Sequence, residues 1–338
     1  MSLKRSRHIL AASTALVAAL ALGACGNGDG SDGSTDAGDG GTADGDLVTV
    51  GFVAVGPEGA WRQANEQNIQ DTFTEEAGYE LKFAPAANLD QASQISAFTS
   101  FVDEGVDVIL LSATEGSGWE DSLRRAQEAE IPVILIDRGI EPDDSSLYVS
   151  RIAPDNMEVS SAVAEWAVSE FPDGGRYFVL EGPAGVSVVN ERNEGWDAVM
   201  DDQTQFERVG AQTANWSTEE ARSVFETVLR SEGNDIDLVF AQNDEMGLGA
   251  ALAAEAAGLQ PGVDVQIATI DGTQNALEAL AEGRLSFVAE YNPLFGETAM
   301  EVVEKVLAGE EVESYIIVPS ETFDSPEAAA EALPDRQF

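Results

Sequence analysis

The sequence is poor in the residues on which much enzyme chemistry depends. Among its 338 residues there is one histidine, His8, and one cysteine, Cys25, and both lie at the N-terminal end. If this end is removed up to Cys25 and the cysteine is modified, neither side chain remains available. Cys–His and Ser–His–Asp catalysis would then be excluded, as would zinc sites built from His or Cys. We therefore expect no catalytic residue, no metal site and no cofactor, although carboxylate chemistry and oxygen-ligand metals stay open.

Basic residues are also scarce. The chain has 17 basic and 62 acidic residues, which gives a formal net charge of −45, and only three of the basic residues are lysines. Loss of the three basic residues near the N-terminus would bring the charge to about −48. Nucleic acid is not expected as a partner, because its phosphates would be repelled. Such a surface suits a saline habitat or reflects genome composition, and the sequence leaves both explanations open.

Residues 1–25 have the pattern of a secretory signal. Lys4, Arg5 and Arg7 precede an apolar run over residues 9–22, which is too short for a comfortable membrane span. The run ends in Leu-Gly-Ala-Cys, which resembles a bacterial lipobox, so we expect Cys25 to be lipid-modified and to become the new N-terminus. Two acyl chains on one cysteine supply stable anchoring. The alternative is a simple signal with a chance cysteine.

Residues 26–46, GNGDGSDGSTDAGDGGTADGD, are almost wholly Gly, Asp, Ser, Thr and Ala. This segment has too little apolar surface to fold, so it is expected to be a flexible acidic linker. A linker between a lipid anchor and a folded body is typical of a protein displayed on the outer face of the cytoplasmic membrane.

From Leu47 onward, short apolar runs alternate with segments of helical periodicity. The runs are LVTVGFVAV, VDVILLS, IPVILID, RYFVLEG, DLVFAQN, VQIATID and LSFVAEY, with AGYELKFAP and FERVGAQ as further strands. Continuous apolar strands that alternate with helices are typical of parallel sheets covered on both faces. The sequence therefore predicts an α/β fold with two doubly wound parallel-sheet lobes that meet near residues 151–156. The expected helices are 61–77, 90–104, 119–129, 156–170, 218–231 and 245–257.

Polar and aromatic residues follow the apolar runs. Ligands of open parallel sheets bind outside the carboxyl ends of the strands, so these residues are candidates for a binding site. Carboxylates, amides and arginines suit hydroxyl groups, and flat aromatic rings suit the C–H face of a sugar ring. The pattern predicts a neutral polyhydroxylated ligand, and the first strand-to-helix turn lacks a phosphate-binding glycine spacing. The residues are Glu58, Trp61, Arg62, Thr114, Trp119, Asp137, Arg138, Ser187, Asn190, Arg192, Asn215, Trp216, Asn243, Asp244, Asp271 and Glu290.

Some of these residues have ordinary structural explanations. Asp155, Ser217 and Asp244 could each cap the helix that follows. Trp119 and Trp196 could be core residues. The sequence does not decide between these roles and contact with a ligand.

The pair Asp137 and Arg138 directly follows the apolar run IPVILI. An ion pair between them could close the edge of the sheet. However, adjacent strand residues point to opposite faces, so a mutual ion pair is awkward geometry. We expect both side chains to reach into a crevice and contact a ligand. Arg192 leaves a similar choice, because it could pair with a neighbouring glutamate on a helix surface.

Seven ordered stretches of the body resemble a known family. They are VGFVAVGPEGAWRQA, FVDEGVDVI, GWEDSLRRAQEAEIPVILIDRGI, SLYVSRIAPDN, ERNEGW, AQNDEMGLGA and IDGTQNALEAL, and they run from Val50 to about Pro293. The chain is similar to the ribose- and galactose-binding group of type I periplasmic sugar-binding proteins, which serve ABC importers. Within that group it looks most like the galactofuranose-binding type.

The resemblance implies two lobes joined by three chain crossings, with the sugar held between the lobes. The N-terminal lobe would comprise residues 47–153 and 291–319, and the C-terminal lobe residues 154–290 and 320–338. The implied protein is a monomeric, non-enzymatic binding protein that passes a monosaccharide to the permease subunits of an ABC importer. The signal and linker suit a Gram-positive bacterium, which has no outer membrane.

The resemblance also implies roles for single residues. Trp61 and Trp216 match aromatic positions that stack on the sugar, and Asp137 with Arg138 matches a paired sugar clamp. The other matching positions are Glu58, Arg62, Arg192, Asn243, Asp271 and Glu290.

Two departures from the family pattern leave the identity of the sugar open. Ribose-binding relatives have phenylalanines where this chain has Ala60 and Trp61, which disfavours ribose. Trp216 stands where the galactofuranose type is expected to have phenylalanine. Another pentose, a hexose or an autoinducer-type ligand is therefore the main alternative. A glycoside hydrolase using Asp137 and Asp271 is a remote one. A LacI-type regulator would need a basic DNA-binding domain where this chain has a signal and an acidic linker.

Overall fold

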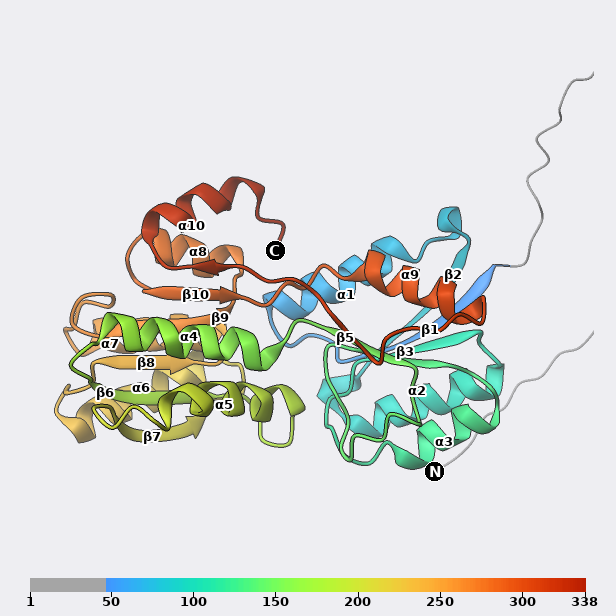
Figure 1. The fold of residues 1–338 in the computed structure, drawn as a ribbon, viewed down its shortest axis with the longest axis horizontal. Helices are drawn as coiled ribbons and strands as arrows, with labels where there is room; N and C mark the ends of the chain where they lie inside the picture. The colour runs from blue at the N-terminus through green and yellow to red at the C-terminus, as the bar shows by residue number, and fades with distance from the viewer. Residues whose placement is uncertain (1–46) are drawn as a thin grey trace, which may run out of the picture. The chain divides into compact units, whose positions relative to one another are not determined.

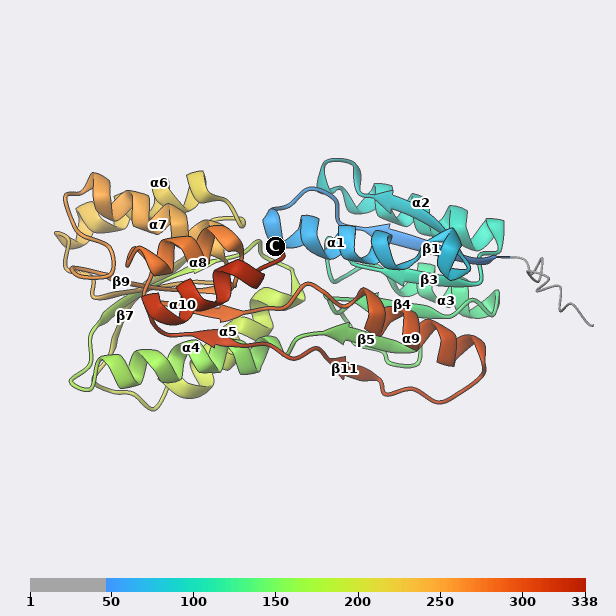
Figure 2. The same ribbon diagram turned by 90° about the horizontal axis from the view of Figure 1, so that it is seen from above.

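The computed structural model describes residues 47–338. The expected signal, Cys25 and the acidic linker lie outside the described residues. The described part contains two six-stranded sheets, each with helices on both faces (Figures 1 and 2). The prediction of two parallel-sheet α/β lobes is confirmed.

The first sheet has the strand order β11-β5-β4-β3-β1-β2, and all its neighbouring strands are parallel. Figure 1 shows α1 and α9 on one side of this sheet and α2 and α3 on the other. The strands are β1 (Val48–Ala54), β2 (Tyr79–Pro85), β3 (Val108–Leu111), β4 (Val133–Ile136), β5 (Ser150–Ala153) and β11 (Tyr315–Ile317). The helices are α1 (Ala60–Thr72), α2 (Gln91–Glu104), α3 (Glu120–Glu128) and α9 (Gly296–Leu307).

The second sheet has the order β12-β10-β9-β8-β6-β7, and only the edge strand β12 is antiparallel to its neighbour. Figure 2 shows α4 and α5 on one side and α6, α7 and α8 on the other. The strands are β6 (Arg176–Glu181), β7 (Glu207–Thr213), β8 (Leu238–Ala241), β9 (Gln266–Asp271), β10 (Phe287–Glu290) and β12 (Thr322–Phe323). The helices are α4 (Asn156–Glu170), α5 (Ser187–Met200), α6 (Thr218–Glu232), α7 (Asp244–Ala256), α8 (Gln274–Ala281) and α10 (Pro326–Ala332).

The chain passes between the two sheets three times. The crossings follow β5, β10 and β11, as the strand orders require. Each crossing begins at the carboxyl end of its strand, so all three lie at the ends of the sheets where polar residues were expected.

Every residue of the inner strands β3, β4, β8 and β10 is buried. Burial on both faces is the reason that these strands read as continuous apolar runs. Strands β2 and β7, at the sheet edges, are largely exposed or half-buried, and their sequences are correspondingly more polar.

One predicted helix is too long. A helix was expected over residues 61–77, but α1 ends at Thr72 and a separate 3-10 turn covers Glu75–Ala77. The side chain of Thr74 accepts a hydrogen bond from the Ala77 backbone and so begins the new turn. Threonine often offers the backbone this alternative to a continuous helix.

None of the helices within residues 47–338 combines the length and the apolar character needed to cross a membrane.

Candidate functional site

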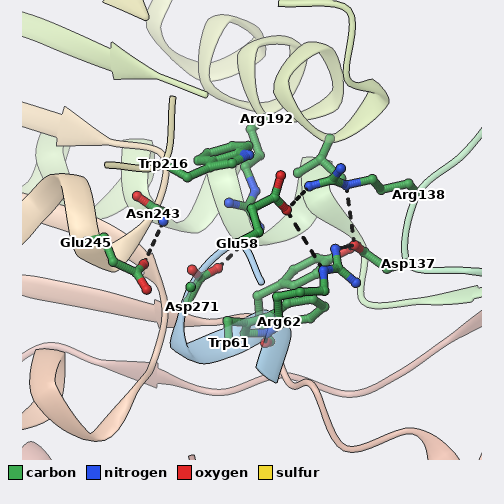
Figure 3. A pocket seen from close by; sticks show the side chains of 13 residues that line it. Glu58, Trp61, Arg62, Asp137, Arg138, Arg192, Trp216, Asn243, Glu245 and Asp271 are labelled. Carbon is green, nitrogen blue, oxygen red and sulfur yellow. Dashed lines mark hydrogen bonds and ion pairs between the residues drawn. The ribbon is translucent and has the colours of Figure 1, made fainter. Parts of the chain in front are cut away.

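Nine of the ten binding residues that the family resemblance implies line one cavity between the two lobes (Figure 3). Loops and first turns that follow the strands supply almost all of them, which is the arrangement that ligand sites in open parallel sheets have. The nine are Glu58, Trp61, Arg62, Asp137, Arg138, Arg192, Trp216, Asn243 and Asp271. Gly59, Val188, Glu245 and Tyr291 complete the lining. The six further candidates at strand ends do not line the cavity, namely Thr114, Trp119, Ser187, Asn190, Asn215 and Asp244.

The turn after β4 brings Asp137 and Arg138 into this cavity together. Asp137 has a φ of 65°, in the left-handed region, which takes the chain out of the strand geometry. The two side chains then lie on the same side, and Arg138 Nε is 3.8 Å from Asp137 Oδ2. A mutual ion pair was expected to be awkward geometry, but the two side chains do approach each other, because strand alternation ends at the residue with positive φ.

The first lobe contributes a closed set of ion pairs to the cavity. Arg62 pairs with Asp137, and Arg138 pairs with Glu58. Burial on its own would raise the pKa of Asp137, but Arg62 and Arg138 outweigh it and hold that pKa below its ordinary value. The arginines of this lobe therefore have carboxylate partners within the protein.

The second lobe holds its charges differently. Arg192 on α5 is buried, and its Nε donates to Asn156 Oδ1 at 3.0 Å while a terminal nitrogen lies 3.5 Å from Asp271 Oδ1. Burial raises the pKa of Asp271 well above its ordinary value, and Arg192 offsets this only in part. Arg192 is thus a buried residue of the cavity and not a member of a surface ion pair.

Two indole rings lie on opposite sides of the cavity, Trp61 from α1 and Trp216 from the turn before α6 (Figure 3). The Trp61 indole N–H donates to the backbone carbonyl of Tyr291. Trp216 Nε1 is buried and has no hydrogen-bond partner among residues 47–338. Arginines flank both rings, with the Arg62 guanidinium 4.8 Å from Trp61 and that of Arg192 5.7 Å from Trp216.

The helix-cap explanation holds for two of the three residues for which it was weighed. Asp155 caps α4 and Ser217 caps α6 through side-chain acceptors. Asp244 does not cap α7, because Asn243 takes that place and its side chain accepts from Met246 N at 3.0 Å. Asn243 therefore both caps a helix and lines the cavity.

The two other tryptophans that were considered are core residues. In the first lobe the ring centroid of Trp119 lies 6.0 Å from that of Phe98. In the second lobe Trp196 stacks on Phe240, with 4.4 Å between the ring centroids. Both are buried in the core and neither lines the cavity.

Glu290 does not line the cavity. Its carboxylate forms an ion pair with Arg336 and accepts from Glu321 N at 3.0 Å. It is the last residue of β10, and Tyr291 directly after it faces the cavity instead. The alternation of neighbouring side chains turns Glu290 toward the C-terminal segment.

Four lining residues were missed by reasoning from the sequence, Gly59, Val188, Glu245 and Tyr291. Glu245 lies in the first turn of α7, two residues after Asn243, and Tyr291 lies one residue beyond the end of β10. A search for binding residues after each strand would have found Glu245 and Tyr291 if it had included one or two more residues along the chain.

Within residues 47–338, no cluster of three or more His, Cys, Asp or Glu side chains has the arrangement of a metal site. The carboxylates of the cavity are engaged mainly with arginines and with backbone or side-chain N–H and O–H groups.

Comparison with known proteins agrees with this architecture. The family model for the periplasmic binding protein domain matches residues 50–311. The fructose import binding protein of Bifidobacterium longum is 45% identical over 98% of this chain and 97% of its own length. The galactofuranose-binding protein of Escherichia coli is 32% identical over 85% of this chain and 90% of its own.

Solved structures give the same result. A crystal structure of a galactofuranose-binding protein matches with a TM-score of 0.81 and 32% identity, covering 86% of this chain and 98% of the other. A Mycobacterium smegmatis protein in complex with β-D-fucofuranose also has a TM-score of 0.81, with 38% identity over 86% of this chain and 95% of the other. The chain belongs to the periplasmic binding protein family.

Proposed function

We propose that this protein is the solute-binding component of an ABC sugar importer and binds one monosaccharide, in its furanose form, in the cavity between the lobes. The observation that carries the proposal is that two indole rings face one cavity together with arginines that already have partners within the protein.

The charge balance favours an uncharged ligand. An anionic sugar phosphate would need a free cation, but Arg62 and Arg138 pair with carboxylates, and the buried Arg192 donates to Asn156 and Gln242. Hydroxyl groups can donate to those carboxylates and accept from the arginines at the same time. The indole faces would pack against the C–H face of the ring.

The cavity has a volume of about 40 Å³ in this arrangement of the lobes, close to the roughly 30 Å³ that one water molecule takes up in the liquid, so its size does not select among sugars. The furanose form is supported by the relatives, whose names and structures include galactofuranose and β-D-fucofuranose. The fructose import relative makes fructofuranose a ligand to test first.

Isothermal titration calorimetry tests the proposal directly. The panel is fructose, galactofuranose, arabinose, ribose and galactose, with fructose 6-phosphate as the anionic control. We expect micromolar affinity, about −8 kcal/mol, for one furanose-forming sugar and none for the phosphate. Carbon-13 NMR of the labelled bound sugar should show the furanose anomeric signal. Tight binding of the phosphate, or of a pyranose form, would contradict the proposal.

One observation favours a second function. The pKa of Asp137 is lowered and that of Asp271 is raised, a pattern that acid and base pairs of glycoside hydrolases also have. Against it, both oxygens of Asp137 already have partners in Arg62 and Tyr291. Release of nitrophenol from nitrophenyl furanosides would support the hydrolase and count against pure binding.

We further propose that Cys25 carries a lipid anchor on the outer face of the cytoplasmic membrane of a Gram-positive bacterium. Residues 26–46 would then form an acidic linker to the folded body, which docks on the permease as a monomer. Support comes from the Leu-Gly-Ala-Cys sequence. Labelled palmitate should enter the wild-type protein and not Cys25→Ser.

We also propose that the lobes have the bounds 47–153 with 291–319 and 154–290 with 320–338. Strands β1–β5 and β11 fall in the first set, and β6–β10 and β12 fall in the second.

A further inference from the structure

Tyr291 stands where the chain leaves β10 and crosses to the first lobe. It is 1% exposed and lines the cavity, although its chain neighbour Glu290 faces away from it. A large, fully buried tyrosine in a polar cavity usually has a partner for its hydroxyl group. Here the hydroxyl group has two partners.

The two partners of the hydroxyl group belong to different lobes. Tyr291 Oη donates to Asp137 Oδ1 at 2.9 Å, at the end of β4 in the first sheet. It accepts from Asn156 Nδ2 at 3.0 Å, at the start of α4 in the second lobe. Burial raises the pKa of Tyr291 well above its ordinary value, so the hydroxyl group keeps its proton and remains a donor.

The rest of Tyr291 also contacts both halves of the cavity. Its ring centroid lies 5.3 Å from that of Trp61, in the first lobe. On the other side, the Arg192 guanidinium lies 4.8 Å from the Tyr291 ring. Tyr291 therefore contacts Trp61 of the first lobe and Arg192 of the second lobe, as well as the carboxylate of Asp137.

We propose that Tyr291 is a positioning residue of the sugar site, whose hydroxyl group fixes the orientation of the Asp137 carboxylate and couples it to Asn156 of the other lobe. This inference rests on the proposed function, because its consequence is sugar affinity. Asp137 has two oxygens to present, and Arg62 and Arg138 contact only Oδ2. Tyr291 is what holds Oδ1.

Removal of the Tyr291 hydroxyl group would mainly affect Asp137, which would lose a hydrogen-bond donor. Asn156 Nδ2 has a second acceptor, Glu191 Oε2 at 2.7 Å, so its amide would stay partly satisfied. Asp137 Oδ1 would lose its donor in a buried place and could rotate away from the geometry that a sugar hydroxyl requires. A lower affinity is expected without loss of the fold.

The variant Tyr291→Phe removes the hydroxyl group and keeps the ring contacts with Trp61 and Arg192. We expect sugar affinity to fall about tenfold by calorimetry, equal to about 1.4 kcal/mol. The matched control is Tyr315→Phe, because the Tyr315 hydroxyl donates to Pro154 O at 2.9 Å near another crossing but does not line the cavity. The control should change affinity less than twofold. Equal affinity of Tyr291→Phe and wild type would overturn the proposal.

A double-mutant cycle separates positioning from a general structural role. Thermal melting of the sugar-free protein is measured for Tyr291→Phe, Asp137→Ala and the double variant. Alanine leaves no acceptor for the Tyr291 hydroxyl, so if the hydroxyl acts through Asp137, the melting shift caused by Tyr291→Phe should fall by half or more in the Asp137→Ala background. Additive shifts would overturn the inference. This measurement needs no ligand, so it stands apart from the sugar panel, in which failure of the wild type to bind any sugar would instead reject the proposed function.

Discussion

The position of Trp216 is determined by backbone geometry. Asn215 and Trp216 have φ values of 51° and 58°, both in the left-handed region. The indole ring lies against Gly182, where an added Cβ would overlap the ring. Two consecutive residues thus adopt an unfavourable backbone conformation, and this conformation directs the indole ring into the cavity. Backbone strain of this kind is typical of functional positions.

Replacing Trp216 by alanine should weaken sugar binding sharply. Loss of the ring removes a stacking face at the centre of the cavity, and we expect a cost on the order of 2 kcal/mol, about 30-fold in affinity. Trp166→Ala is the control, because Trp166 stacks 5.2 Å from Phe287 away from the cavity and should lower stability without changing affinity. Calorimetry on both variants makes the comparison, and unchanged affinity in Trp216→Ala would refute the stacking role.

Asp244 is a buried carboxylate close to the cavity. Burial raises its pKa to about 7, although Thr273 and Thr269 donate hydrogen bonds to it. A raised pKa in the folded state means that the folded protein binds more protons than the unfolded chain between about pH 4 and pH 7. Stability from this group should therefore increase as the pH falls through 7, by up to about 1.4 kcal/mol per pH unit.

The variant Asp244→Asn tests this dependence. Lower pH also reduces the general repulsion among acidic residues, so the useful quantity is the difference in melting temperature between wild type and variant. That difference should shift in favour of the wild type between pH 8 and pH 5.5. A difference that is constant over this range would show that Asp244 titrates as an ordinary carboxylate.

Among the secondary-structure elements, nine strands were predicted, and the inner ones were recognisable because buried parallel strands must be apolar along their whole length. Strands β5, β11 and β12, which have only 4, 3 and 2 residues, were missed. The rule that ligands bind at the carboxyl ends of parallel strands gave sixteen candidate residues, and nine of them line the cavity. Glu290 was misplaced because it is still the last residue of β10, and strand alternation directs it away from Tyr291. Glu245 was missed because its role depends on which helix start lies opposite, and a sequence does not show that contact.

Helix α1 lacks a cap of its own. Its N-cap residue is Gly59, which has no side chain to accept from the first backbone N–H groups. Instead, Glu245 of α7 in the other lobe accepts from Ala60 N at 2.9 Å, and its other oxygen accepts from Asn243 Nδ2 at 2.7 Å. A carboxylate at a helix N-terminus is favourable because of the exposed N–H groups and the helix dipole.

The variant Glu245→Ala should therefore weaken sugar binding, since the cap forms between the lobes at the helix that carries Trp61. Loss of a cap typically costs about 1 kcal/mol, about fivefold in affinity. Glu255→Ala is the control on the same helix, because Glu255 pairs with Arg284 in a largely exposed place. Equal effects of the two substitutions on sugar affinity would contradict the role of Glu245 across the cavity.

At the scale of the whole molecule, the charges inside and outside the cavity follow different rules. Inside, Arg62 and Arg138 pair with Asp137 and Glu58, and Arg192 lies beside Asp271. Outside, acidic residues far exceed basic ones, and the formal net charge of the chain is −45. Repulsion of this size opposes compactness, while the cavity stays suited to an uncharged ligand.

Salt should therefore stabilise the folded protein. Screening also weakens exposed ion pairs such as Lys82–Glu104 and Arg124–Glu120, but exposed pairs of this kind contribute little to stability. The net repulsion is spread over the whole surface and should dominate. The melting temperature should rise mainly between about 0.01 M and 0.5 M NaCl, where the screening length falls most, and level off above that.

Sucrose at matched osmolality is the control for solute exclusion. A protein equally stable with and without molar salt would show that acidity places no demand on its fold, and the idea of a saline habitat would lose its support.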